Sequence, residues 1–385
     1  MTTQLEMRTS ERGSLKSCAQ QWYWSQVEGL APRRAANPLW FGSAVHEGLA
    51  SWYRPGLERG PHPVETFDKF LQGERAMIVT NNDEEAEYVN ARDLGHDMLN
   101  RYVEHYGRDD TWDVIATEKT FRVNIARPAR QMFGLDIPAQ KRWLRYVGTW
   151  DGVYRDLTTG EIWLMEHKTA ASIVVAHLPL DDQAGSYWAL ATVVLRKSGI
   201  LGPKEEIAGI MYNFLRKAPN DGRPQNSEGQ YTNLPKKPNY VEALFNHYGE
   251  SGADSDEMRD WEGELPKMTL ASLQDMAAIQ GLHVLGDPSK SQPPPYFERY
   301  PVYRSKGERA RMIRRIQDEA FFAEAYRSGD LPVTKAPDKQ RCRWCPFERM
   351  CQLDESGDQF AVEEFKESQF LVRNPYADHV KKSAE

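Results

Sequence analysis

The chain has 385 residues, of which 40% are hydrophobic and 27% charged, so a collagen-like or wholly disordered chain is excluded. Lys and Arg number 49 against 56 Asp and Glu, and the net charge of −7 excludes a uniformly basic nucleic-acid-binding protein. No run approaches the roughly 18 apolar residues of a membrane helix, and residues 1–12 lack a signal-peptide core. We therefore expect a soluble cytoplasmic protein without a membrane partner.

The first 110 residues are predicted to be mostly helical, because aromatic and apolar side chains recur there at helical spacing. Residues 111–217 begin with three segments rich in β-branched and aromatic residues, which predict a meander of strands. The predicted strands are Val114–Ile125, Tyr146–Asp156 and Glu161–Thr169. A helix at 181–196 and a buried strand at 207–215 follow. This order predicts an α/β fold with a small mixed central sheet flanked by helices.

The amino-acid composition changes in the second half of the chain. Residues 218–295 contain several proline-rich stretches and predict an insertion or partly flexible lobe with one or two helices, near 241–248 and 270–280. Residues 296–353 predict a strand, a long basic helix and a cysteine segment. Residues 354–385 are acidic and are predicted to form a mobile tail.

The strongest candidate site lies on the last two strands of the meander. Alternate side chains of a strand share a face, so Glu166 and Lys168 point the same way and His167 points opposite. Asp151 lies on the preceding strand, within reach of this pair. Two carboxylates beside a lysine suit Mg²⁺ or Mn²⁺, which can activate water for phosphodiester cleavage. For this pattern alone, a surface hairpin with alternating charges is the alternative.

Further polar residues lie on predicted helices and strands. His46 follows the small residues Gly42, Ser43 and Ala44 on a predicted helix, and Gln183 and Tyr187 are four residues apart, which places them on one helix face. Taken alone, each of these features is also typical of an ordinary core or surface group.

Together and in this order, the features resemble the RecB-like branch of the PD-(D/E)XK nucleases. The motifs that carry the resemblance are Ser14–Trp24, Gly42-x₃-His46, Glu118, Gly148-x₂-Asp151, Glu166-x-Lys168 and Gln183-x₃-Tyr187. The resemblance implies a restriction-endonuclease-like core. It also implies a catalytic metal held by His46, Asp151, Glu166 and the backbone carbonyl of His167. Lys168, Gln183 and Tyr187 would be catalytic, and Glu118 would be an accessory polar residue.

The four cysteines form a second constellation. Cys342, Cys345 and Cys351 lie within one short segment, and Cys18 lies far away in sequence. Disulfides are not expected in a reducing compartment, so a metal centre is favoured, with zinc as one alternative. The pattern resembles that of iron–sulfur nucleases related to RecB, namely the CRISPR-associated exonucleases of the Cas-four type and the AddB nuclease domain. The resemblance implies a [4Fe–4S] cluster on all four cysteines, which would tie the N-terminal helix to the C-terminal segment.

Basic side chains gather in two stretches that predict a channel for a DNA backbone. Residues 299–315 hold seven basic residues and one acidic residue, and a second group spans residues 127–145. The predicted DNA contacts are Arg142, Arg145, Arg304, Lys306, Arg311, Arg314 and Arg315. Trp143, Tyr146 and Trp344 are predicted to stack on bases. A solvated helix face is the alternative for either group alone.

These features predict a Mg²⁺- or Mn²⁺-dependent DNA exonuclease with a [4Fe–4S] cluster. By resemblance it acts on single-stranded ends, with 5′→3′ polarity favoured, in DNA recombination, repair or processing. The sequence has no phosphate-binding loop of the ATPase type, so a helicase or recombination partner would be a separate chain. The alternatives are a DNA-binding adaptor of a recombination or DNA-acquisition complex with weak or no nuclease activity, and a nuclease directed at RNA.

Overall fold

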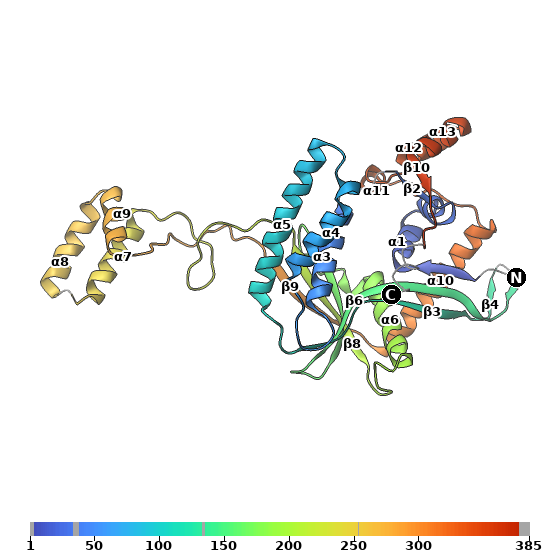
Figure 1. Ribbon diagram of the computed structural model, residues 1–385, viewed down its shortest axis with the longest axis horizontal. Coiled ribbons are helices and arrows are strands. Elements are labelled where there is room, and N and C mark those ends of the chain that lie inside the picture. The colour runs from blue at the N-terminus through green and yellow to red at the C-terminus, as the bar shows by residue number, and fades with distance from the viewer. Residues whose placement is uncertain (1–3, 34–37, 133–134, 253, 377–385) are drawn as a thin grey trace. The chain divides into compact units, whose positions relative to one another are not determined.

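The computed structural model describes residues 4–33, 38–132, 135–252 and 254–376 (Figure 1). The chain divides into two compact units. The main unit comprises Met1–Ala218 and Tyr296–Glu385, and the insertion unit comprises Pro219–Pro295. No helix among the described residues is long and apolar enough to span a membrane.

A six-stranded mixed sheet forms the centre of the main unit. Its strands are β1 (Leu5–Arg8), β3 (Trp112–Arg127), β6 (Gln140–Asp156), β7 (Ile162–Ala170), β8 (Ile207–Arg216) and β9 (Phe297–Tyr303). The long strand β6 pairs with β3 on one side, and with β1 and then β7 on the other. The β3–β6–β7 pairings are antiparallel and β8 runs parallel to β7, so the predicted α/β class and mixed sheet are confirmed.

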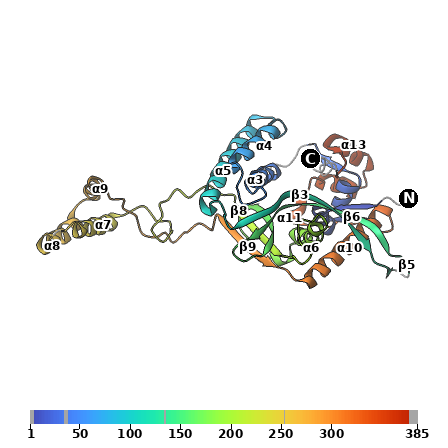
Figure 2. The same cartoon turned by 60° about the horizontal axis from the view of Figure 1, so that its bottom comes forward.

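Helices cover both faces of this sheet (Figure 2). One face packs against α1 (Thr9–Ser17), α6 (Asp182–Lys197) and α10 (Lys306–Ser328), and the other against α3 (Pro38–Trp52), α4 (Pro63–Ile78) and α5 (Asn82–Tyr106). Strand β7 contributes to both cores by simple alternation. Ile162 and Leu164 face the first core, whereas Trp163 and Met165 face the second. Continued alternation separates Glu166 and Lys168 from His167, as the sequence predicts.

The insertion unit has a small core of its own. Its helices are α7 (Lys237–Glu250), α8 (Ser255–Glu264) and α9 (Leu270–Ile279), which enclose Leu244, Leu265, Leu273 and Ala277. The sequence predicts one or two helices here and misses α8, because that helix buries none of its side chains. The unit carries twelve acidic and six basic residues, a net charge of −6, which leaves −1 for the rest of the chain.

The prediction of a mobile tail is wrong for residues 354–376. After α12 (Glu348–Glu355), the chain forms α13 (Gln359–Gln369) and β10 (Phe370–Val372), which pairs with β2 (Leu30–Pro32). Val362 and Phe370 join a small core with Trp24 and Phe347. The sequence did not predict these elements, because their few apolar residues are widely spaced among many acidic ones. The remaining part of the predicted tail, 377–385, lies outside the described residues.

Candidate active site

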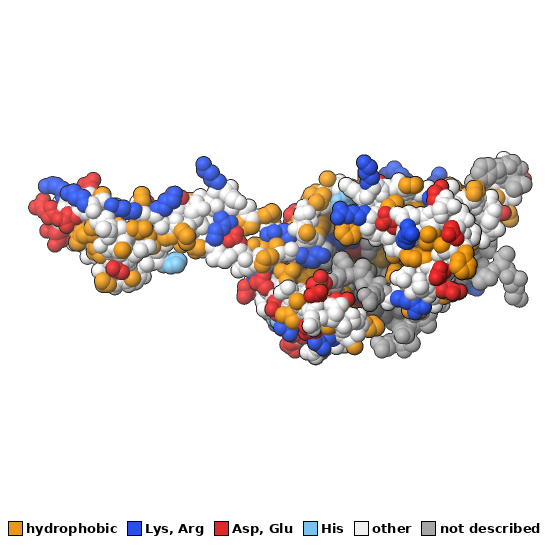
Figure 3. Space-filling model, turned by 90° about the horizontal axis from the view of Figure 1, so that it is seen from above, with side chains coloured by type: hydrophobic (Ala, Val, Ile, Leu, Met, Phe, Trp, Pro, Cys, Tyr) orange, Lys and Arg blue, Asp and Glu red, His pale blue; other side chains and the backbone are white. Residues whose placement is uncertain are grey.

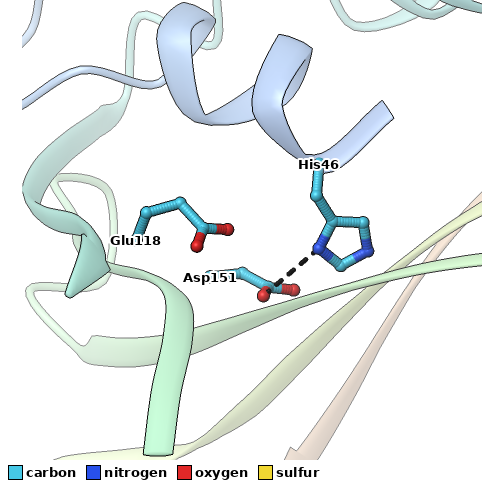
Figure 4. A group of neighbouring side chains, drawn as sticks. All are labelled: His46, Glu118 and Asp151. Carbon is cyan, nitrogen blue, oxygen red and sulfur yellow. Dashed lines mark ion pairs between the residues drawn. The ribbon is translucent and has the colours of Figure 1, made fainter. Parts of the chain in front are cut away.

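Three side chains from three elements meet beside strand β6 (Figure 4). His46 comes from α3, Glu118 from β3 and Asp151 from β6. The Nδ1 atom of His46 lies 3.4 Å from Oδ1 of Asp151. One ligand atom from each of these three residues lies within 4.8 Å of the other two. Among the described residues, no other set of three His, Cys, Asp or Glu side chains lies this close together. The structure therefore brings the predicted accessory residue Glu118 into the site.

The backbone of Glu118 adopts an unusual conformation. Its φ of 39° lies in the left-handed region, which costs a non-glycine residue on the order of 1–3 kcal/mol. Its neighbours Thr117 and Lys119 pair with Gly152 and Trp150, so Glu118 lies opposite Asp151. Such strain persists where the surroundings impose it and is concentrated at functional sites. Sequence reasoning had no signal for this backbone conformation.

The carboxylate of Asp151 is fixed by its neighbours. Its Oδ2 accepts a hydrogen bond of 2.6 Å from the backbone N–H of His167. Burial raises the pKa of Asp151, but His46 and this N–H outweigh burial and lower the pKa to about 2. Burial lowers the pKa of His46, but Asp151 and the other carboxylates outweigh it and raise the pKa to about 9. The two residues thus form an ion pair at neutral pH when no cation is bound.

Glu166 and Lys168 form the second half of the site. The Nζ atom of Lys168 donates to Oε1 of Glu166 at 2.7 Å. The Oε2 atom of Glu166 is buried and has no hydrogen-bond partner among the described residues. Burial raises the pKa of Glu166 to about 7, and although burial lowers the pKa of Lys168, Glu166 raises it above its ordinary value. A buried carboxylate oxygen without a donor is unfavourable, and a bound cation would satisfy it.

The donor set fits a hard divalent cation. Carboxylate oxygens and one imidazole nitrogen are ligands that Mg²⁺ and Mn²⁺ accept. Among the described residues, His46, Glu118 and Asp151 supply such atoms within 4.8 Å of one another, and the predicted ligand Glu166 lies outside this group. The buried, unsatisfied oxygen of Glu166 is a further carboxylate atom that a bound cation would satisfy.

The sequence over residues 10–352 matches the family model of the PD-(D/E)XK nuclease superfamily. The chain belongs to this superfamily. The matched span includes every residue of the site and all four cysteines. No curated protein matches the chain. PD-(D/E)XK nucleases use divalent metals, in agreement with the donor set of the site.

A buried hydrogen-bond chain behind the nuclease site holds His167. Asn213 on β8 donates to Nδ1 of His167 at 2.8 Å and to the hydroxyl of Tyr102 at 2.9 Å. From Tyr102 the chain continues through Tyr53, Asp109 and Arg299. Burial lowers the pKa of His167 to about 3, so its ring stays neutral. Sequence reasoning missed this chain, because its members lie in elements far apart in sequence.

Asn213→Leu removes this support while keeping a side chain of the same branched shape. Because His167 orients Asp151, we expect about tenfold to a hundredfold weaker Mn²⁺ binding. The Mn²⁺ concentration dependence of DNA cleavage measures this effect. Asn124→Leu, on the exposed part of β3, is the matched control. Unchanged Mn²⁺ dependence in Asn213→Leu would show that this hydrogen-bond chain does not help to position Asp151.

Metal binding by the nuclease should be linked to pH. The proton on His46 must leave and Glu166 must be ionised before both can bind a cation, and their pKa values are about 9 and about 7. Affinity for Mn²⁺ should therefore rise with pH between about 6 and 9. Calorimetry at pH 7 in two buffers of different ionisation enthalpy should detect at least one released proton per ion. The number should fall by about one in His46→Ala, and binding without proton release would contradict this expectation.

The two accessory residues on α6 have different environments. Tyr187 is buried, and burial together with the Glu166 carboxylate raises its pKa, whereas Gln183 is exposed in the first turn. A Cβ atom at Gly148 would lie 2.6 Å from the Tyr187 ring, which explains the glycine three residues before Asp151. The catalytic roles of Gln183 and Tyr187, and of the His167 carbonyl, stay predictions.

The four cysteines line one cavity of about 530 Å³. Cys18 lies in an extended break between α1 and α2 (Ala19–Trp22), and the other three lie on or beside α11 (Lys339–Arg343) and α12. Their sulfur atoms do not form a group as compact as the His46 group. Burial and the neighbouring thiols raise the pKa of Cys345, and raise that of Cys351 to about 11.

The structure corrects part of the predicted DNA surface. Trp143 and Tyr146 are fully buried, so the prediction that they stack on bases is wrong. Arg304 donates to the carbonyls of Leu178 and Pro179 and is 6% exposed, which argues against its predicted DNA contact. On the face in Figure 3, basic side chains are dispersed among acidic and apolar ones. Six contacts stay predictions on exposed residues: Arg142, Arg145, Lys306, Arg311, Arg314 and Arg315.

Proposed function

We propose that this chain is a Mg²⁺- or Mn²⁺-dependent DNA exonuclease of the RecB-like type, which hydrolyses phosphodiester bonds at single-stranded ends. The observation that carries the proposal is the unsatisfied oxygen of Glu166 beside Lys168 and the His46–Asp151 pair. Membership of the PD-(D/E)XK superfamily supports DNA as the substrate. The order of the motifs along the chain supports the RecB-like type.

Each residue has a role in this proposal. A divalent cation would polarise the scissile phosphate and lower the barrier to attack by water. His46, Asp151 and Glu166 would hold that cation, and the His167 N–H keeps Asp151 oriented. Lys168 stays protonated because Glu166 raises its pKa, so its ammonium can stabilise negative charge that develops on the phosphate.

We also propose a [4Fe–4S] cluster on the four cysteines. The cavity that all four line supports a multi-iron group, because each thiolate of such a cluster binds a different iron. In such a cluster the four thiolates need not lie as close together as the ligands of a single metal ion. A cluster there would tie the break between α1 and α2 to the α11–α12 segment.

Cleavage of linear and circular single strands tests the proposed function. Linear DNA with a label at either end, and circular DNA of the same sequence, are incubated with Mn²⁺ or EDTA. We expect Mn²⁺-dependent degradation of linear DNA, intact circles, and early release of a 5′ label. Cut circles would overturn the exonuclease assignment, and early release of a 3′ label would overturn the polarity. DNA binding without cleavage would favour the adaptor, and a preference for matched RNA would overturn the DNA assignment.

A further inference from the structure

A second cavity, of about 700 Å³, lies next to the cysteines. Its walls include Gln21, Lys339, Arg341, Arg343, Trp344 and Cys345. The N-terminal helices and the cysteine segment both contribute, since Arg341 donates to the backbone carbonyl of Ser17. The cavity therefore depends on the contact between the N-terminal and C-terminal parts of the main unit.

Among the described residues, the cavity lining includes three cations and no carboxylate. Lys339 and Arg343 form no ion pair with any described residue, whereas Arg341 lies 3.6 Å from Asp338. On the basic helix α10, Arg309 and Arg315 are paired with acidic residues, so only part of its charge is available to an external anion. The cations beside the cysteines can therefore bind an external anion.

Trp344 adds an aromatic surface to these cations. Its side chain is 80% exposed, and the guanidinium of Arg343 lies 5.4 Å from its ring centroid. An exposed indole beside unpaired cations matches the two requirements of single-stranded nucleic acid, which are a stacking surface for bases and positive charge for phosphates. A purely apolar ligand would leave the cations unpaired.

We propose that this cavity is a binding subsite for single-stranded DNA, in which a base stacks on Trp344 and neighbouring phosphates contact Lys339 and Arg343. The proposal rests on the proposed nuclease function and adds a second point of contact for the strand. Because the cavity is built on the cysteine segment, loss of the metal centre there should also weaken DNA binding.

Binding of a fluorescent oligothymidylate in EDTA tests the subsite without cleavage. Trp344→Ala should weaken binding by about tenfold or more, and Trp344→Phe should restore most of the loss because stacking is retained. Arg343→Gln should weaken binding and reduce its salt dependence. Phe360→Ala is the matched control, because Phe360 on α13 is equally exposed (81%) but lies outside the cavity wall.

A second readout separates the subsite from a general effect on folding. Trp344→Ala should raise KM for DNA by about tenfold with little change in kcat, and a strand containing 5-iodouracil should crosslink to Trp344 on irradiation. Wild-type binding by Trp344→Ala, or crosslinks confined to other segments, would overturn the subsite. If the wild-type protein binds the strand through Trp344 but never cleaves it, the nuclease proposal fails and the subsite stands.

Discussion

Glu166→Gln should reduce Mn²⁺-dependent cleavage of single-stranded DNA by on the order of 10³-fold. Glutamine keeps the size of the side chain but removes the negative charge that pairs with Lys168 and that we propose binds a cation. The variant should also be as stable as the wild-type protein without metal, or more stable, because a buried charge with an unsatisfied oxygen is removed. Rates and thermal unfolding curves measured in parallel test both parts.

Glu161→Gln is the matched control, since it makes the same chemical change just before β7 begins, outside the site. Asp151→Asn and Lys168→Ala should give losses similar to that of Glu166→Gln. Wild-type cleavage rates in all three site variants would refute the site assignment. If Glu166→Gln loses activity because it unfolds, Lys168→Ala tests the site assignment instead. The Lys168 side chain is 28% exposed, so its removal should disturb the fold less.

Cys345→Ala should abolish the proposed [4Fe–4S] cluster of the cysteine segment. Anaerobically purified wild-type protein should be brown and contain about four iron and four sulfide per chain, whereas the variant should be colourless. Because Cys18 and Cys342 lie more than 300 residues apart, loss of the centre releases a very long loop. We expect a lower unfolding temperature and rapid proteolysis of the segment that contains α12 and α13.

Ser17→Ala, next to Cys18, is the control for this experiment, because it leaves all four thiols in place. It should retain iron, sulfide and colour. Stoichiometric zinc without sulfide in the wild-type protein would contradict the [4Fe–4S] assignment. Full iron content in Cys18→Ala would show that the distant cysteine is not a ligand.

The sheet and half of the site could be predicted because their signals are local. Alternation along β7 orients Glu166 and Lys168, and one hairpin brings Asp151 close to them. Glu118 reaches the site through a left-handed backbone conformation, which no pattern in the sequence predicts. His46 required the resemblance to a family, since a histidine on a helix has no chemical signature of its own.

Chemical type alone did not distinguish core from surface. Trp143 is an aromatic residue among arginines and was predicted to stack on bases, yet it packs in the core and donates to Glu324. Arg299 belongs to a basic stretch, but its side chain is only 14% exposed and pairs with Asp109, 190 residues earlier in the chain. Such long-range ion pairs follow from the tertiary fold, so some cations of the predicted basic channel make structural contacts, whereas its exposed arginines and lysine stay predicted DNA contacts.

The most direct test of the metal-dependent nuclease site is a single-turnover cleavage assay with an end-labelled single strand. Wild-type protein and Lys168→Ala are compared with excess Mn²⁺ and with EDTA. We predict that the wild-type protein releases nucleotides with Mn²⁺ alone, and that Lys168→Ala binds the strand but releases none under either condition. Equal release by both proteins, or release by the wild-type protein in EDTA, would contradict the assignment of this site.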